Sequence, residues 1–393
     1  MPEQTSTSPL EGVRVLDFSI MLAGPYCARL LADVGAEVIK IEPPEGDEMR
    51  LRAPVRDGHS AYFGQLNAGK RSIALDLKSS DAIKLVHRMV ENTDILVENF
   101  RPGVMERLGL GPDVMLAANP KLVVGRMTGW GQDGPLAPRA GHDINYIAMS
   151  GVLHAIGRAG EAPVPPLNLV GDFGGGGMLL AFGVACAIAE AQRSGRGQVV
   201  DAAMVEGASL LSTMFWGMQA GGRWSDARGE NILDSGAPWY DVYATQDHRF
   251  VAVGAIEPKF YAELLARMGL ADEALPAQHD RARWPELRQR FAQAFATKTR
   301  DEWCDIFAGS DACFSPVLTF AEAGAHPHNV ARRGHVMLGG VHQPAPAPRF
   351  SRTPGAALRA PPERGASGAE ALEDWGFTRT EIERLRAHGV GCT

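Results

Sequence analysis

Short apolar segments typical of β-strands alternate with segments typical of helices through the first third of the chain, and this alternation limits the fold most. The strand-like segments are residues 13–18, 37–42, 72–77, 94–98 and 121–125. Helix-like segments lie between them at 22–34, which ends at Gly35, and at 79–91. Strands that alternate with helices at this spacing favour βαβ units. The sequence therefore predicts an α/β fold with a mostly parallel sheet.

The rest of the chain has a different character. Its expected elements are apolar helices at 177–193 and 202–220, hairpin strands at 240–244 and 250–254, and helices at 258–268, 284–297 and 300–307. The hairpin and the three helices after it predict a smaller α+β unit. Residues 340–366 are rich in Pro, Ala and Arg and predict an extended connector before a terminal helix at 369–388.

Composition argues against several functional classes. Lys and Arg number 39 and Asp and Glu number 46, so the formal net charge is −7, and a chain this acidic is a poor binder of nucleic acid. The five cysteines are scattered and form no CxxC pair, which argues against a disulfide framework or a structural zinc site and fits a reducing cytoplasm. His326 and His328 lack neighbouring carboxylate or cysteine ligands, so no metal is expected.

No segment of the sequence predicts membrane contact. Residues 1–12 have neither the basic nor the apolar region of a signal peptide. The longest apolar run, 177–189, is too short to span a bilayer. We therefore expect a cytoplasmic protein without a membrane partner.

Two segments carry side chains suited to acid–base chemistry. His142 and Asp143 are adjacent in a polar turn, and histidine exchanges protons readily near neutral pH; a structural hydrogen-bonding role is the alternative. Asp172 lies in the glycine-rich stretch 171–177, which opens an apolar helix. In one interpretation, free N–H groups of this stretch face an oxyanion and the Asp172 carboxylate lies beside them. In the other, Asp172 caps the helix and the glycines permit close packing.

Further polar residues accompany these two segments. Asn168 either orients a carboxylate or satisfies backbone groups of a turn. Glu257, at the end of an apolar strand, is either a charge at a helix start or a partner that raises the basicity of a histidine. Cations suited to phosphate contacts, with surface ion pairs as the alternative, are Lys70, Arg71, Arg101 and Arg107.

Several of these segments, in order along the chain, resemble the family III CoA-transferases and, within them, the branch of α-methylacyl-CoA racemases. Motifs similar to the wider family are GVRVLD at 12–17, AGP at 23–25, KRSIALDL at 70–77 and ENFRPG at 98–103. Motifs similar to the racemase branch are GHDINY at 141–146, PLNL at 166–169, GDF at 171–173 and GAIEP at 254–258. The resemblance covers residues 10–350, approximately.

The resemblance implies a Rossmann-like large domain and a smaller α+β domain in an interlocked homodimer. The implied ranges are 1–200 for the large, CoA-binding domain, 201–235 for a helical linker, 236–325 for the small domain, and 326–393 for a linker and a C-terminal segment that returns to the large domain.

The resemblance also implies a reaction, the interconversion of (2R)- and (2S)-2-methylacyl-CoA thioesters by two bases through an enolate. His142 and Asp172 are the implied bases, Glu257 of the partner chain pairs with His142, and Asp143 and Asn168 support the site. The four cations above would contact the CoA phosphates, and N–H groups of residues 174–177 would stabilise the enolate oxygen. CoA belongs to the substrate, so no cofactor is expected.

Two other functions remain open on the sequence. A CoA-transferase would use Asp172 as a nucleophile that forms an acyl anhydride, but such a covalent route needs no opposed histidine base. A catalytically silent CoA-binding dimer would need no acid–base residues, and the intact His142, Asp172 and Glu257 argue against it.

Overall fold

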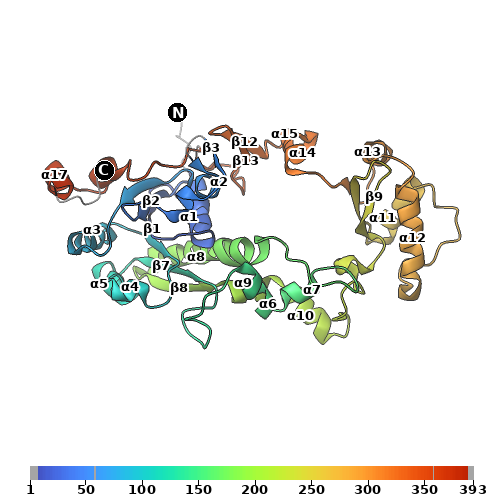
Figure 1. The fold of residues 1–393 in the computed structure, drawn as a ribbon, viewed down its shortest axis with the longest axis horizontal. Helices are drawn as coiled ribbons and strands as arrows, with labels where there is room; N and C mark the ends of the chain where they lie inside the picture. Colours follow the sequence, from blue (N-terminus) through green and yellow to red (C-terminus); the bar gives the residue numbers. More distant parts are fainter. Residues whose placement is uncertain (1–7, 57–58, 357, 388–393) are drawn as a thin grey trace. The chain divides into compact units, whose positions relative to one another are not determined.

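The structure is a computed structural model that describes residues 8–56, 59–356 and 358–387, and the described chain forms two compact units (Figure 1). The large unit comprises the described parts of Met1–Ser150, Pro166–Ser212 and Arg333–Thr393; the small unit comprises Gly151–Pro165 and Thr213–Arg332. The expected ranges divide the chain differently: they place 151–165 in the large domain, 201–235 in a linker and 326–332 with the C-terminal segment. Residues 1–7 and Cys392, on which expectations about targeting and cysteines partly rest, lie outside the described residues.

A parallel sheet of six strands, in the order β5-β2-β1-β6-β7-β8, forms the centre of the large unit. The strands are β1 (Arg14–Asp17), β2 (Glu37–Glu42), β5 (Arg71–Ala74), β6 (Ile95–Glu98), β7 (Val123–Thr128) and β8 (Gln198–Ala203). The chain runs outward from β1 on one side and from β6 on the other, as in doubly wound nucleotide-binding sheets. The predicted parallel α/β sheet is confirmed. The edge strand β8 was not predicted, because its first four residues are exposed or only partly buried and show no alternation of buried and exposed positions.

Helices cover both faces of this sheet. Helices α1 (Ala23–Asp33) and α8 (Leu179–Ser194) share one hydrophobic core, and α3 (Ser80–Val90) and α16 (Gly368–Asp374) share the other. The C-terminal segment is tied to the sheet edge, where the Gly365 N–H donates to Ser72 Oγ at 2.9 Å. The segment after residue 358 is therefore part of the fold of the large unit.

The apolar helix is longer than the sequence predicted. Among the described residues, Leu169–Met178 is π-helical and continues into α8, so Leu169–Ser194 forms one helix of 26 residues that is long and apolar enough, by length and composition, to cross a membrane. In the large unit it packs against α1, β7 and α9 (Met204–Leu211). The predicted helix began at residue 177, because the glycines and Asp172 before it were interpreted as the polar segment that opens the helix. In the structure this segment is itself helical.

The small unit contains an antiparallel sheet in the order β11-β10-β9 with helices against its buried face. Its elements are β9 (Tyr240–Ala244), β10 (Phe250–Gly254), β11 (Phe314–Pro316), α11 (Pro258–Arg267), α12 (Trp284–Phe295) and α13 (Arg300–Phe307). Trp239, Phe291 and Trp303 are buried in its core. The predicted hairpin and the three predicted helices are confirmed.

The remaining α-helices and β-strands are β3 (Val55–Arg56), β4 (His59–Ser60), α2 (Ala61–Asn67), α4 (Val104–Arg107), α5 (Pro112–Ala118), α6 (Asp143–Met149), α7 (Val152–Ala155), α10 (Thr213–Ala220), α14 (Phe320–Ala325), α15 (Pro327–Ala331), β12 (His335–Leu338), β13 (Val341–Pro344) and α17 (Arg379–Ala387). The connector at 340–366 thus includes one strand of a hairpin. The predicted terminal helix is split into α16 and α17 at Gly376, whose φ of 90° ends the first of them.

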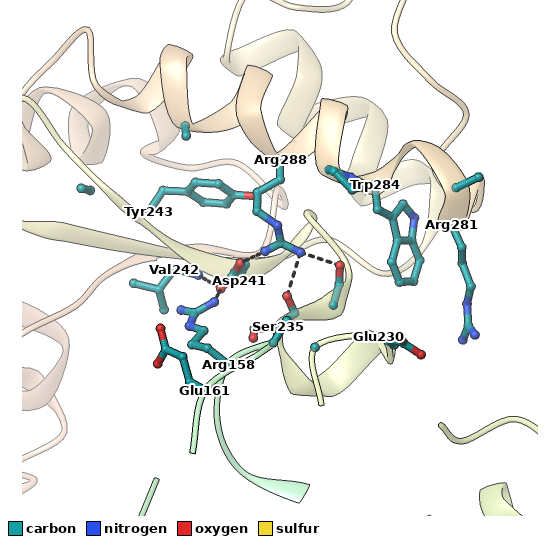
Figure 2. A pocket seen from close by; sticks show the side chains of 17 residues that line it. Arg158, Glu161, Glu230, Ser235, Asp241, Val242, Tyr243, Arg281, Trp284 and Arg288 are labelled. Atoms are coloured by element: carbon teal, nitrogen blue, oxygen red, sulfur yellow. Dashed lines mark hydrogen bonds and ion pairs between the residues drawn. The ribbon is translucent and has the colours of Figure 1, made fainter. Parts of the chain in front are cut away.

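A cavity of about 970 Å³ lies within the small unit, between the segment around Arg158 and helix α12 (Figure 2). The buried carboxylate of Asp241 accepts from Arg158 Nη1 at 2.5 Å on one oxygen and from Arg288 on the other. The two guanidinium groups are thereby engaged by the chain itself. None of the predicted catalytic residues is among the described residues that line this cavity.

Candidate active site

A second cavity, of about 510 Å³, lies in the large unit at the carboxyl ends of β1, β6 and β7. The strand order changes direction between β1 and β6, and open α/β sheets bind ligands at this position. The lining includes His142, Asp172, Arg101 and Arg139. The fold thus brings two residues that are thirty positions apart, the predicted bases, to one cavity.

His142 precedes the first residue of α6 and is exposed at the cavity. Its backbone N–H donates to Asn145 Oδ1 at 3.0 Å, which fixes the start of the helix. Tyr146 donates from its hydroxyl to the Gly141 carbonyl at 2.5 Å, and its ring packs edge-on against Trp130 with centroids 4.8 Å apart. The backbone around His142 is therefore held, while its imidazole lines the cavity.

Asp172 lies in the first turn of the long helix and is partly buried. Burial raises the pKa of its carboxyl above the ordinary value, and the nearby Asp143 charge acts in the same direction. The hydrogen bond from Asn168 Nδ2 to Asp172 Oδ2, 3.1 Å long, and the charge of His142 oppose this rise. A carboxyl whose pKa is moved toward neutrality suits proton transfer better than an exposed aspartate does.

Asp143 supports Asp172 through the backbone. Its buried carboxylate accepts from the Asp172 N–H at 2.7 Å, through Oδ2, and the Gly171 N–H also donates to this carboxylate. A Cβ on Gly171 would lie 2.4 Å from Asp143 Oδ2, so glycine is needed there. Asp143 therefore fills the role of a cap for the first turn of the long helix, and it fixes the orientation of Asp172.

The glycines at 174–177 do not present free N–H groups to the cavity. The helix begins earlier, at Leu169, so these residues lie inside it. A Cβ on Gly175 would lie 2.6 Å from Ala208 N, and one on Gly177 would lie 2.5 Å from the Ala23 carbonyl oxygen. The expectation that they stabilise an oxyanion is wrong, and the close-packing interpretation holds, because α9 and α1 approach the helix backbone at these positions.

The predicted cations separate into two groups. Arg101 lines the cavity just after β6, and Arg107 is exposed one turn further on, at the end of α4. Lys70 is buried, and its Nζ donates to Asp17 Oδ2 at 2.8 Å, to Asn67 Oδ1 and to the Pro25 carbonyl. The ammonium group of Lys70 is therefore engaged inside the fold, contrary to the expected phosphate contact.

Arg71 does not reach the cavity either. It starts β5, and its guanidinium pairs with Glu37 at 2.8 Å and with Asp374 at 2.6 Å, at the end of the sheet where β2 begins. Arg139, which sequence reasoning missed, lines the cavity from the loop after β7. The only sequence signal for a role of Arg139 in the site is that it lies three residues before His142. A single arginine in a polar loop forms no recognisable pattern.

Glu257 belongs to the small unit. It follows β10 and immediately precedes α11, where it is exposed. A carboxylate at this position interacts favourably with the N-terminus of the helix. Its pairing with His142 stays a prediction.

Among the described residues, no group of three or more histidine, cysteine or acidic side chains could hold a metal ion. The four described cysteines, Cys27, Cys186, Cys304 and Cys313, are unpaired. The lining places two side chains that can exchange protons, His142 and Asp172, beside Arg101 and Arg139.

The fold and this site define a protein of CoA-transferase family III, whose family model matches residues 10–368, and the chain belongs to this family. It is 48% identical to an alpha-methylacyl-CoA racemase of Mus musculus and 44% identical to one of Homo sapiens, in each case over 97% of both chains. It is 34% identical to a succinyl-CoA–D-citramalate CoA-transferase of Chloroflexus aurantiacus, over 99% of this chain and 100% of the other.

A solved structure has the same fold. A CaiB/BaiF family protein of Brucella suis superposes with a TM-score of 0.83 at 26% identity, covering 94% of this chain and 100% of that one. The expected resemblance to family III and to its racemase branch is confirmed by these relatives.

Proposed function

We propose that this protein is a racemase of 2-methylacyl-CoA thioesters. The observation that carries the proposal is that His142 and Asp172 line one cavity, in a chain whose racemase relatives match it nearly end to end. One base removes the proton from C2, and the electron pair of that bond enters the thioester carbonyl to form an enolate. The other base, protonated beforehand, delivers a proton to the opposite face.

CoA supplies the binding handle in this proposal, so no further cofactor is required. Binding energy from a remote, non-reacting part of the substrate can be used to hold C2 between the two bases. In the same proposal the protein is a homodimer, and the Glu257 side chain of the partner chain stabilises protonated His142. Support for a homodimer comes from an apolar face of the long helix, where Met178 and Phe182 are 52% and 67% exposed. The unpaired cysteines fit the cytoplasmic location that belongs to the same proposal.

Deuterium incorporation tests the function. The enzyme is incubated in D2O with one enantiomer of a 2-methylacyl-CoA, and both mass and optical purity are followed. Deuterium at C2 with loss of optical purity is the expected result. No exchange, together with acyl-CoA formation when a free carboxylic acid is added, would make Asp172 a nucleophile and this protein a CoA-transferase.

The two arginines that line the cavity are expected to bind the CoA phosphates. A charged hydrogen bond contributes about 1.5–3 kcal/mol, so Arg101→Ala and Arg139→Ala should each raise KM for the thioester by roughly 10- to 100-fold. The kcat should change less, because the phosphates take no part in the proton transfer at C2 and their contacts persist from the bound substrate to the transition state. Arg71→Ala is the matched control and should leave KM unchanged, since its guanidinium is engaged by Glu37 and Asp374. Equal effects of all three substitutions would contradict this assignment.

The pH dependence should report Asp172. Its carboxylate is the active base for one enantiomer, so kcat/KM for that enantiomer should fall as pH drops through its raised pKa. Asn168→Ala removes a hydrogen bond that favours the carboxylate, so the acidic limb of the profile should move to higher pH. Asn329→Ala, which alters an amide of the small unit, is the control. If the acidic limb of the pH profile did not move in Asn168→Ala, Asn168 would not influence the pKa of Asp172.

A further inference from the structure

One wall of the candidate active site is a strained loop. Residues 18–22 join β1 to α1, and Ile20, Met21 and Leu22 line the same cavity as His142 and Asp172. Met21 has a φ of 65°, in the left-handed region that residues with a Cβ rarely adopt. Such a conformation persists only where the surroundings impose it. The contacts on either side of Met21 show how it is imposed.

The side chain of Asn99 holds the residue before Met21 at both of its backbone groups. The Ile20 N–H donates to Asn99 Oδ1 at 2.8 Å, and Asn99 Nδ2 donates back to the Ile20 carbonyl at 2.7 Å. Asn99 directly follows β6, so the neighbouring strand fixes the loop after β1. One amide therefore determines the direction in which the chain enters Met21.

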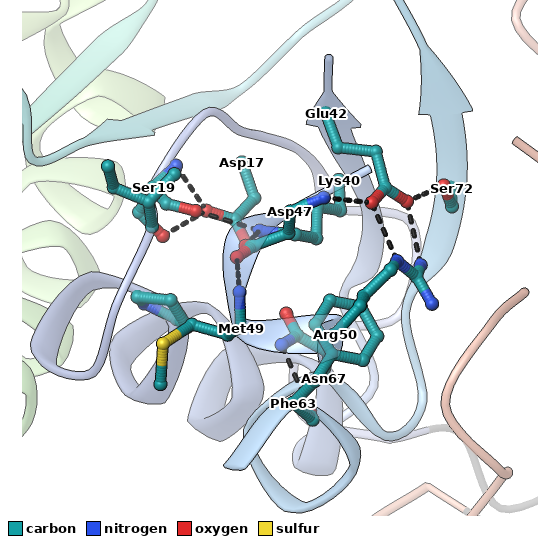
Figure 3. A network of polar contacts seen from close by, with 12 residues as sticks. Asp17, Ser19, Lys40, Glu42, Asp47, Met49, Arg50, Phe63, Asn67 and Ser72 are labelled. Carbon is teal, nitrogen blue, oxygen red and sulfur yellow. Dashed lines mark hydrogen bonds and ion pairs between the residues drawn. The ribbon is translucent and has the colours of Figure 1, made fainter. Parts of the chain in front are cut away.

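Buried charges fix the next residue back. The Ser19 N–H donates to Asp17 Oδ1 at 2.9 Å, and Lys40 Nζ donates to the Ser19 carbonyl at 2.8 Å (Figure 3). Asp17, Ser19 and Lys40 are all fully buried. Lys40 is in turn paired with Asp47 at 2.7 Å. Ser19 thus has both backbone groups bonded, as Ile20 does.

The first turn of α1 closes the loop from the other side. A Cβ on Gly24 would lie 2.4 Å from Ser19 Cβ and 3.2 Å from Asn99 Cγ. Only glycine fits between the helix and these two side chains. The loop is therefore fixed on both sides of Met21, by the hydrogen bonds to Ser19 and Ile20 before it and by the close approach at Gly24 after it, and these contacts impose its positive φ.

We propose that Met21 determines which acyl chains the site accepts, and that Asn99 is the positioning residue that holds it in place. The inference rests on the proposed function and names a determinant of its substrate. Backbone direction decides where the Met21 side chain lies along the cavity wall. The unbranched thioether then adapts to the chain attached to C2.

The variant Met21→Gly distinguishes a role of the Met21 side chain in substrate selection from a role in the stability of the fold. Glycine adopts a positive φ without strain, so the Tm of this variant should equal or exceed that of the wild type. The ratio of kcat/KM for 2-methyldodecanoyl-CoA to that for 2-methylbutanoyl-CoA should nevertheless change by about tenfold, because a pocket contact with an apolar chain is lost. Asn99→Ala should change the same ratio with a lower Tm. Asn99→Asp, which keeps the acceptor for the Ile20 N–H, should be intermediate.

His248→Gly is the matched control. His248 also has a positive φ, of 59°, but lies in the turn between β9 and β10 of the small unit. The Tm of His248→Gly should likewise equal or exceed that of the wild type, and the ratio of kcat/KM values should stay unchanged. A ratio within about twofold of the wild type for Met21→Gly would overturn the proposal, because a lost pocket contact changes it by more. A lower Tm with equal losses on both thioesters would also overturn it, by assigning Met21 to packing.

A wild-type protein that racemises neither thioester would refute the proposed function instead. The affinities of the wild type and Met21→Gly for the two thioesters, measured by calorimetry, then test the inference by themselves. A changed affinity ratio would support it, and an unchanged ratio would overturn it.

Discussion

Replacing either base is expected to slow racemisation strongly, while each variant still exchanges the C2 proton of one of the two enantiomers. General acid–base catalysis contributes about 10²–10⁴-fold, so Asp172→Asn and His142→Gln should each slow racemisation by that factor. In Asp172→Asn the remaining imidazole still removes and returns the C2 proton on its own face. One enantiomer should therefore incorporate deuterium from D2O with its configuration retained, and His142→Gln should do the same for the other enantiomer.

Mass spectrometry and chiral analysis of each enantiomer measure these outcomes separately. Asn145→Ala is the control, because it removes a partner of the His142 backbone without altering either base, and it should lower the rate less than either substitution. If Asp172→Asn and His142→Gln exchanged the same enantiomer, the two groups would not lie on opposite faces of C2. Full racemisation by Asp172→Asn would remove Asp172 from the mechanism.

Lys70→Met is expected to destabilise the fold rather than weaken substrate binding. Burial pulls the pKa of Lys70 down and by itself would raise that of Asp17, but the mutual attraction of the two groups keeps the pair charged and lowers the pKa of Asp17. Removing Lys70 leaves the buried Asp17 charge without its hydrogen-bonded counter-ion, although Lys40 still lies nearby, and breaking comparable pairs costs about 3–5 kcal/mol. Chemical denaturation should show a loss of this size in the unfolding transition of the large unit.

Lys84→Met is the matched control for this loss. Lys84 pairs with Asp81 on an exposed helix surface, where such pairs contribute about 0–1 kcal/mol, so its removal should hardly change stability. A Lys70→Met protein of normal stability with a raised KM for the CoA thioester would return Lys70 to the phosphate site. That result would contradict the buried contacts with Asp17, Pro25 and Asn67.

The fold was predictable where a periodic pattern continued long enough to bury a face. The alternation in the first third of the chain predicted five of the six strands of the parallel sheet, and the hairpin at 240–254 was predicted from its two alternating runs. Strand β8 and the split at Gly376 were missed. An edge strand buries only part of one face, and a helix break depends on one backbone torsion, so neither leaves a repeating pattern.

The candidate site was predictable in its residue types and less so in their surroundings. His142 and Asp172 were singled out as side chains able to exchange protons, but their local pattern also fits a structural hydrogen bond and a helix cap. The resemblance to the racemase branch made them the expected bases. The phosphate contact predicted for Lys70 was wrong. The adjacent cations Lys70 and Arg71 give no local signal that Lys70 is buried against Asp17 while Arg71 pairs with Glu37 at the end of the sheet. Arg139 was missed for the converse reason, since its loop reaches the cavity only after β7 is placed in the sheet.

The sequence by itself determined the α/β class, the order of the elements and the two side chains suited to proton transfer, because periodicity and side-chain chemistry are local properties. The tertiary structure alone decided which groups meet. It joined Asp143 to the backbone of Asp172, buried Lys70 against Asp17, and turned the glycines at 174–177 into a packing surface. These outcomes depend on residues far apart in the chain, and only the packing of α1, α9 and the parallel sheet brings them within hydrogen-bonding or van der Waals distance.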